Sequence, residues 1–311
     1  MKFNCREDII QMTPLWTGER LSDGRPNVPT EILERLRKMT VEEVWKAGWI
    51  KNYNYQFERE LKHTHPVDVP LVGRAVTSTY VPIREDLEIA MKRQAKSQGM
   101  IQSYNQWVID NLIEDDVVVA DMYDKIKEGT FIGGNLSTAL ASKTKRGGAV
   151  VWGGIRDLAQ IEGIEGINIF YRGIDPTPLR EYVMVGYNVP CRIGHAICLP
   201  GDIVYGCKSG VYFIPAHLAE EVVNDAERVH VKDMFGFQRV REGKYNAAIV
   251  DSFPWSMEIF EDFMEWFRTD EKAKPYQYLD WSQDLAETTA GVSAEHERYI
   301  QGSQMKDICE V

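Results

Sequence analysis

The 311-residue sequence lacks several patterns by which common protein classes are first noticed. No apolar run approaches the roughly 18 residues that a membrane-spanning helix needs, and the first residues hold no apolar leader segment. The five cysteines form no CxxC pair, which favours reduced thiols over disulfides. No GxGxxG, Walker A or GxSxG motif occurs, so nothing indicates a dinucleotide, ATP or a serine nucleophile. We therefore expect a cytoplasmic protein without membrane association.

Basic residues are also under-represented. Lysine and arginine number 36 against 47 aspartates and glutamates, which gives a net charge of −11. A surface of that sign repels phosphate backbones, so we expect no nucleic-acid partner. The hydrophobic fraction of 44% is typical of a globular protein, and the length allows one large domain or two small ones.

Hydrophobic periodicity indicates a mixed α/β chain. An alternating β-branched pattern predicts a strand over 72–82, and 3.6-residue spacing predicts helices over 85–99, 134–146, 156–162 and 215–235. Short apolar segments separated by glycines predict further strands between these helices. The predicted organisation is an N-terminal arm rich in Pro and Gly (1–29), an α/β core domain (30–225) and a helical C-terminal extension (226–311).

One constellation of residues could carry chemistry. Gly133 and Gly134 lie where a predicted helix begins, and free N–H groups there attract carboxylate or phosphate. Arg156 and Asp157 follow the next buried strand and could reach the same rim. Such a set suits a 2-keto acid, because Asp157 could hold a divalent cation while Arg156 neutralises enolate charge. The alternative is an ordinary helix start in which Asp157 complements the helix dipole.

The order of motifs resembles a known family. Asn135 is followed by twenty residues and then by Arg156-Asp157, with VGRAVT at 72–77, RGIDPTPL at 172–179 and a matching segment at 189–222. Residues 30–225 resemble the family of the regulator of ribonuclease activity A (RraA) and the 4-hydroxy-4-methyl-2-oxoglutarate/4-carboxy-4-hydroxy-2-oxoadipate aldolases. The resemblance implies an RraA-type β/β/α swivelling core.

The resemblance also implies a function and a set of site residues. It implies a divalent-metal-dependent lyase, an aldolase or decarboxylase, acting on a small 2-keto acid or sugar-acid-derived substrate. Asp157 would bind Mg²⁺ or Mn²⁺, and Arg156 would bind and stabilise the pyruvate enolate. Backbone amides of Gly134, Leu136 and Ser137 would hold the substrate carboxylate. The resemblance further implies a homo-oligomer, a trimer or a hexamer.

Two departures from the family pattern leave the reaction open. Asn135 stands where the aldolases have a catalytic Asp, so it can orient a water but cannot share its proton. Gln160 stands where the family often has an acid. The alternatives are a non-catalytic regulator that binds a protein partner and a metal-dependent sugar-acid dehydratase or isomerase. The candidates for a carboxylate contributed by a neighbouring subunit are Glu220, Glu221, Glu227 and Asp233.

Overall fold

The computed structural model describes residues 5–50, 53–100 and 104–292. The described residues divide into two compact units, and each is treated by itself. The N-terminal unit runs to Val41 and resumes from Asn54 to Glu220, whereas the C-terminal unit combines residues from Glu42 to Tyr53 with those from Glu221 onward. None of the helices in this described part has the length and apolar character needed to cross a bilayer.

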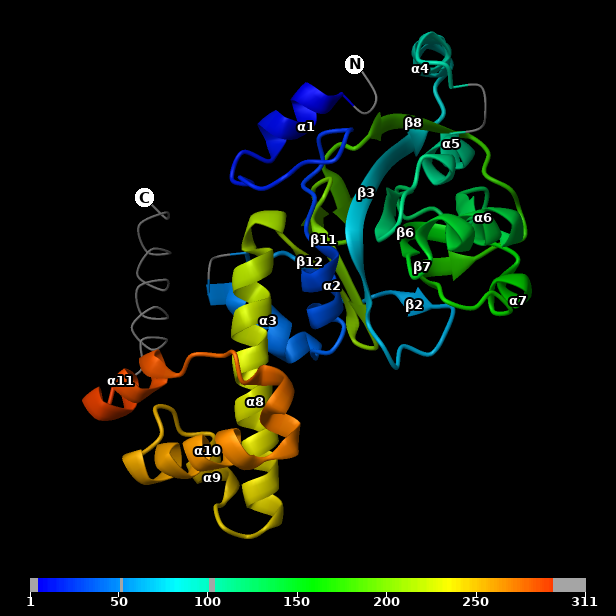
Figure 1. Ribbon diagram of the computed structural model, residues 1–311. Helices are drawn as coiled ribbons and strands as arrows, with labels where there is room; N and C mark the ends of the chain where they lie inside the picture. The colour runs from blue at the N-terminus through cyan, green and yellow to red at the C-terminus, as the bar shows by residue number, and fades with distance from the viewer. Residues whose placement is uncertain (1–4, 51–52, 101–103, 293–311) are drawn as a thin grey trace, which may run out of the picture. The chain divides into compact units, whose positions relative to one another are not determined.

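Twelve strands lie in the described part of the N-terminal unit (Figure 1). They are β1 (Phe57–Glu58), β2 (Lys62–His63), β3 (Leu71–Pro82), β4 (Asp116–Asp121), β5 (Thr130–Ile132), β6 (Gly148–Ile155), β7 (Asn168–Ile174), β8 (Tyr182–Tyr187), β9 (Cys191–Ile193), β10 (Ala196–Cys198), β11 (Ile203–Cys207) and β12 (Gly210–Ile214). The helices of this unit are α1 (Arg6–Met12), α2 (Thr30–Leu36), α4 (Glu85–Ser97), α5 (Tyr104–Asp110), α6 (Gly134–Thr144), α7 (Leu158–Ile161) and the 3₁₀ helix η1 (Ala216–Leu218).

Ten of these strands form one mixed sheet. Its order is β1-β12-β11-β3-β4-β6-β7-β2, with β5 paired to β6 and β8 paired to β3. The β3, β4, β6 and β7 ladders are parallel, whereas β8 and β11 run antiparallel to β3. The long strand β3 uses residues 71–74 for β11 and residues 78–82 for β8. The predicted α/β core is therefore confirmed.

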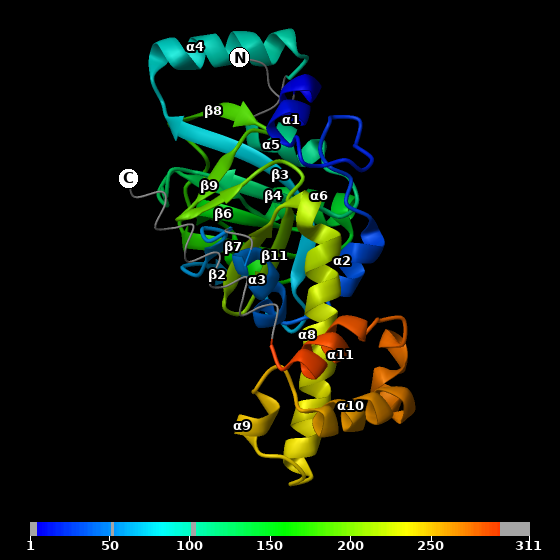
Figure 2. The same cartoon turned by 90° about the vertical axis from the view of Figure 1, so that its left-hand side faces the viewer.

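The sheet separates two hydrophobic clusters, because successive strand residues point to opposite faces. Val118 and Ala120 of β4 pack in a cluster with buried residues of α4, α5, α6 and α7. Val117 and Val119 pack on the other face with residues of the β9–β10 hairpin. Figure 2 shows α4 beside β8, where β3 ends. The helix that begins at Gly134 is therefore held on the first face.

The segment before α2 is tied to the sheet by a buried charge. Arg25 is 3% exposed, and its guanidinium contacts both carboxylate oxygens of Asp116 at 2.8 and 3.1 Å. It also donates to the carbonyl of Ala75 at 3.3 Å. A buried pair needs such extra hydrogen bonds to offset desolvation. The segment predicted as an arm thus contains the helix α1 and a core contact.

The C-terminal unit is helical. It comprises α3 (Val41–Ile50, whose first residue is grouped with the N-terminal unit), α8 (Ala219–Arg241, whose first two residues are grouped with the N-terminal unit), α9 (Ala247–Val250), α10 (Met257–Thr269), the 3₁₀ helix η2 (Glu271–Tyr276) and α11 (Ser282–Ala290). Its core is an aromatic cluster in which Phe235 of α8 packs against Phe263 and Trp266 of α10. The helical C-terminal region is therefore confirmed. The predicted boundary between residues 225 and 226 falls inside α8 and stays a prediction.

Candidate functional site

The two glycines and the Arg-Asp pair meet at one edge of the sheet. Strand β5 leads into α6 and strand β6 leads into Arg156 and Asp157, and these strands pair in parallel with Ile132 opposite Ile155. The Arg156 amide donates to the Ile132 carbonyl at 3.0 Å. Because parallel strands place their carboxyl ends at the same edge, both predicted halves of the site lie together.

The Asp157 carboxylate is held in place by the backbone. Asp157 has φ +58°, in the left-handed region, which Asp and Asn tolerate better than most residues. Its Oδ2 accepts a hydrogen bond from the Gly134 amide at 3.1 Å and lies 3.8 Å from Nε of Arg156. The side chains of Arg156 and Asp157 are 40% and 32% exposed, so both face solvent at the rim.

Gly133 is required by this close approach. A Cβ at position 133 would lie 2.5 Å from Oδ2 of Asp157 and 2.9 Å from Cγ of Arg156. At position 134 it would instead meet Oε1 of Gln160 at 2.2 Å. The absence of both methyl groups lets the N-terminus of α6 lie against the Arg-Asp pair and Gln160. The glycine pair was the sequence signal for this contact, although the partner atoms could not be predicted.

The first turn of α6 offers two free amides. The Ser137 amide donates to the Gly133 carbonyl at 2.9 Å, and the Gly134 amide is used by Asp157. No described residue accepts from the amides of Asn135 and Leu136. The Gly134 and Ser137 amides, which the sequence assigned to a substrate carboxylate, thus already have acceptors within the chain, and that assignment stays a prediction. The role of the Leu136 amide also stays a prediction, and Ser137 has a buried hydroxyl with no partner among the described residues.

Asp157 is the carboxylate that could hold a cation here. Among the described residues no three His, Cys, Asp or Glu side chains gather as a metal site. Asn135 is exposed at the start of α6 and supplies an amide rather than a second carboxylate. Mg²⁺ commonly keeps several waters and takes one or two protein carboxylates together with substrate oxygens. One fixed and partly exposed carboxylate fits that mode of binding.

A second group of charges lies where β4 ends. Arg172 forms an ion pair with Asp124 at 2.9 Å and stacks over the Trp152 ring at 4.5 Å. Asp121 lies 3.6 Å from Nε of Arg192, and burial raises the pKa of its carboxyl group above the ordinary value although Arg192 opposes the shift. These side chains already satisfy one another, which favours a structural role for Arg172 and the two aspartates.

The candidate carboxylates near the C-terminal side belong to α8. Glu227 is 2% exposed and accepts a hydrogen bond from the Tyr278 hydroxyl at 2.5 Å, so that interaction already uses one of its oxygens. Glu220, Glu221 and Asp233 lie on the same helix. Whether a neighbouring copy contributes one of them stays a prediction.

Comparisons with known proteins decide the family. The model of the RraA-like family (Aldolase/RraA) matches residues 40–213, more than half of the chain. This chain belongs to the RraA-like family. A protein of Halalkalibacterium halodurans provisionally named 4-hydroxy-4-methyl-2-oxoglutarate aldolase is 27% identical over 161 residues, which cover 51% of this chain and 74% of that relative.

Two solved structures share the fold of this chain. RraAS2 of Streptomyces coelicolor, described as an unusual member of the RNase ES inhibitor RraA family, aligns with a TM-score of 0.55 and 22% identity, over 68% of this chain and 96% of that one. An uncharacterized protein of Pseudomonas syringae aligns with a TM-score of 0.56 and 19% identity, over 70% and 96%. At identities of 22% and 19%, the likeness to these two structures shows the fold alone.

Proposed function

We propose that this RraA-like protein is a divalent-metal-dependent lyase that cleaves or decarboxylates a small 2-keto acid at the Arg156-Asp157 rim. The observation that supports this most directly is the fixed Asp157 carboxylate, held by the Gly134 amide beside the Arg156 guanidinium. The provisional aldolase name of the Halalkalibacterium relative agrees with the proposal.

Each residue of the rim has a distinct task in this reaction. The free amides of Asn135 and Leu136, at the positive end of the α6 dipole, suit the substrate carboxylate. Arg156 is placed to neutralise negative charge that develops on the keto oxygen. Asp157 would hold Mg²⁺ or Mn²⁺, which when bound would polarise the keto group and favour cleavage of the bond one carbon further out, with its electron pair passing into the enolate.

Asn135 cannot act as the general acid or base of the reaction. Its side-chain amide can hydrogen-bond a water at the start of α6 but cannot accept or release a proton at neutral pH. A proton that the product needs must therefore come from solvent or from another side chain. Decarboxylation of oxaloacetate, in which the enolate takes its proton from water, makes smaller demands on Asn135 than aldol cleavage. It is the reaction to test first.

The test compares two arginines on the same unit. Arg156→Ala should lower Mn²⁺-dependent oxaloacetate turnover by about 10²–10³-fold, the cost of one lost oxyanion donor. Arg146→Ala removes an exposed ion pair with Glu34 and should leave turnover unchanged. Intact turnover in Arg156→Ala, or an equal loss in Arg146→Ala, would contradict the proposal. We also propose that the protein is a homo-oligomer, either a trimer or a hexamer. Light scattering of the same preparations measures its mass in solution.

A non-catalytic regulatory role is the second candidate, and Asn135 favours it because an amide replaces a carboxylate there. Oxaloacetate turnover, measured in wild-type protein and in the Asn135→Asp variant, distinguishes the catalytic role from the regulatory role. If wild-type protein lacks turnover and Asn135→Asp gains it, the machinery is present but silenced in this chain. If wild-type protein turns over oxaloacetate, the regulatory role is not needed.

A further inference from the structure

A cavity of about 310 Å³ lies within the C-terminal unit, between α8 and residues 247–255. This volume is at the lower end of the range of small-molecule sites, which suits a ligand of roughly ten non-hydrogen atoms. The Gly236 position lets the two walls come together, because a Cβ there would lie 2.5 Å from Cγ1 of Val250. The cavity is unrelated to the Arg156-Asp157 rim in sequence and in composition.

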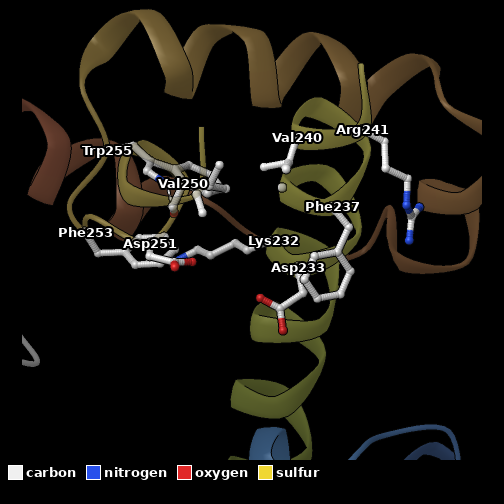
Figure 3. A pocket seen from close by; sticks show the side chains of 11 residues that line it. Lys232, Asp233, Phe237, Val240, Arg241, Val250, Asp251, Phe253 and Trp255 are labelled. Atoms are coloured by element: carbon white, nitrogen blue, oxygen red, sulfur yellow. Dashed lines mark hydrogen bonds between the residues drawn. The ribbon is translucent and has the colours of Figure 1, made fainter. Parts of the chain in front are cut away.

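Aromatic side chains form much of the wall (Figure 3). Phe237 and Phe253 are 59% and 47% exposed, which is unusual for such large apolar groups. Trp255 is 4% exposed, and its indole N–H donates to the Val250 carbonyl at 2.8 Å. Its ring lies 4.9 Å from that of Phe253. The wall therefore combines a fixed indole with two phenyl rings that a ligand could cover.

Two carboxylates face the same space. Asp233 comes from α8 and Asp251 follows α9, and neither forms an ion pair or a side-chain hydrogen bond with another described residue. Burial raises the pKa of the Asp233 carboxyl group, and the nearby charges of Glu43 and Asp251 raise it further, while His230 and Lys46 oppose the shift. Negative charge is thus concentrated here without a direct partner, which favours a cationic occupant.

The chain already places one cation on these rings. Nζ of Lys232 lies 4.8 Å from the centre of the Phe253 ring and 5.9 Å from that of Trp255. Its ammonium forms an ion pair with Asp284 at 2.5 Å, a carboxylate that Arg228 shares, and among the described residues no ion pair joins it to Asp233 or Asp251. The geometry shows that these rings present their faces to positive charge, as cation–π recognition requires. Arg241, the other basic residue of the wall, points away from Asp251 in Figure 3.

The geometry points to a binding site for a small organic cation in this cavity, an ammonium group on an apolar body. The ammonium lies between the Asp233 and Asp251 carboxylates, and the apolar body lies against Phe237, Phe253 and Trp255. The carboxylates supply charge-assisted hydrogen bonds, and the rings supply apolar contact and cation–π attraction.

Three probes of one shape test this site on the full-length protein. They are phenethylammonium, 2-phenylethanol and phenylacetate, and binding is followed through the ¹³C-methyl signals of Val240 and Val250, which line the cavity. We expect phenethylammonium to shift both signals and to bind at least about 10-fold more tightly than the alcohol, as a hydrogen-bonded charge implies. Phenylacetate should bind most weakly.

Variants separate the carboxylates from general charge. Asp233→Asn and Asp251→Asn should each weaken phenethylammonium binding about 5- to 10-fold and leave 2-phenylethanol unchanged. Glu265→Gln on α10 removes an exposed charge that does not line the cavity and should change neither. Equal affinity for the ammonium and the alcohol, tighter binding of phenylacetate, or the same loss in Glu265→Gln would overturn the assignment. These outcomes do not depend on the activity proposed for the Arg156-Asp157 rim.

Discussion

Gly133 offers a sharp test of the candidate site, because its substitution acts on the two functional side chains before it acts on the fold. In Gly133→Ala the new methyl carbon begins 2.5 Å from Oδ2 of Asp157 and 2.9 Å from Cγ of Arg156, whereas ordinary van der Waals contact begins at 3.4 Å. The carboxylate therefore has to move away from the Gly134 amide that holds it at 3.1 Å. Losing the group that orients a metal ligand typically costs about 10- to 100-fold in metal affinity.

The fold should tolerate this change. Gly133 has φ −139°, an extended conformation that alanine adopts without strain. As the residue before α6 it caps the helix, and alanine there costs at most about 1 kcal/mol. We therefore expect Mn²⁺ affinity, measured by the electron paramagnetic resonance of free Mn²⁺, to fall about 10- to 100-fold while the thermal unfolding midpoint changes by only a few degrees.

Gly134→Ala is the matched control. Its methyl group meets the far end of the exposed Gln160 side chain, which can move away, and alanine favours the helix by up to about 1 kcal/mol. Mn²⁺ affinity should stay within about twofold of wild type, since the Asp157 hydrogen bond is retained. The reasoning fails if wild-type protein does not bind Mn²⁺, if Gly133→Ala binds it as wild type does, or if both variants lose affinity alike.

Three further predictions concern backbone, pH and a buried charge. Asp157→Asn should unfold in urea within about 0.5 kcal/mol of wild type, whereas Asp157→Ala should lose about 1 kcal/mol more, because alanine is less tolerant of the left-handed region; equal losses would contradict this. The hydrogen bond to Glu43 raises the pKa of His230, so the stability it adds is complete below pH 6.5 and is lost as pH rises through the folded pKa. Glu43→Gln should flatten that decline in urea titrations between about pH 6 and 9, and an unchanged slope would refute the linkage. Arg25→Ala should lower the free energy of unfolding by about 3–5 kcal/mol, since it leaves the Asp116 carboxylate buried and unpaired; a loss below about 1 kcal/mol would show that water replaces the guanidinium.

Local elements could be predicted from the sequence where one periodicity dominates. The alternating pattern at 72–82 corresponds to β3 at Leu71–Pro82, and the helical pattern at 134–146 corresponds to α6 at Gly134–Thr144. The strand order could not be predicted, because β11 reaches β3 from more than a hundred residues further along the chain. The contact of Arg25 with Asp116 was missed for the same reason, since a turn-rich segment gives no sign of its distant partner.

In the candidate site, too, some features could be predicted from the sequence and others could not. Arg156 and Asp157 are neighbours in sequence, so a strand exit was enough to place them together. The free backbone amides were harder to predict, because a shift of one residue in the start of the helix changes which amides lack an acceptor. The helix begins at Gly134, so the Ser137 amide already bonds to Gly133 and the free pair is Asn135 and Leu136.

The pairing of β3 has a consequence for the order in which the chain is made. One edge of β3 is filled by β4, which follows within about forty residues, but the other edge waits for β8 and β11. At typical synthesis rates the ribosome needs on the order of ten seconds to reach β11 from the end of β3. During that interval residues 71–74 and 78–82 of this largely buried strand lack their partners, and an unpaired edge is a template for wrong pairing with other chains. A chaperone that binds extended segments would find a target at this edge.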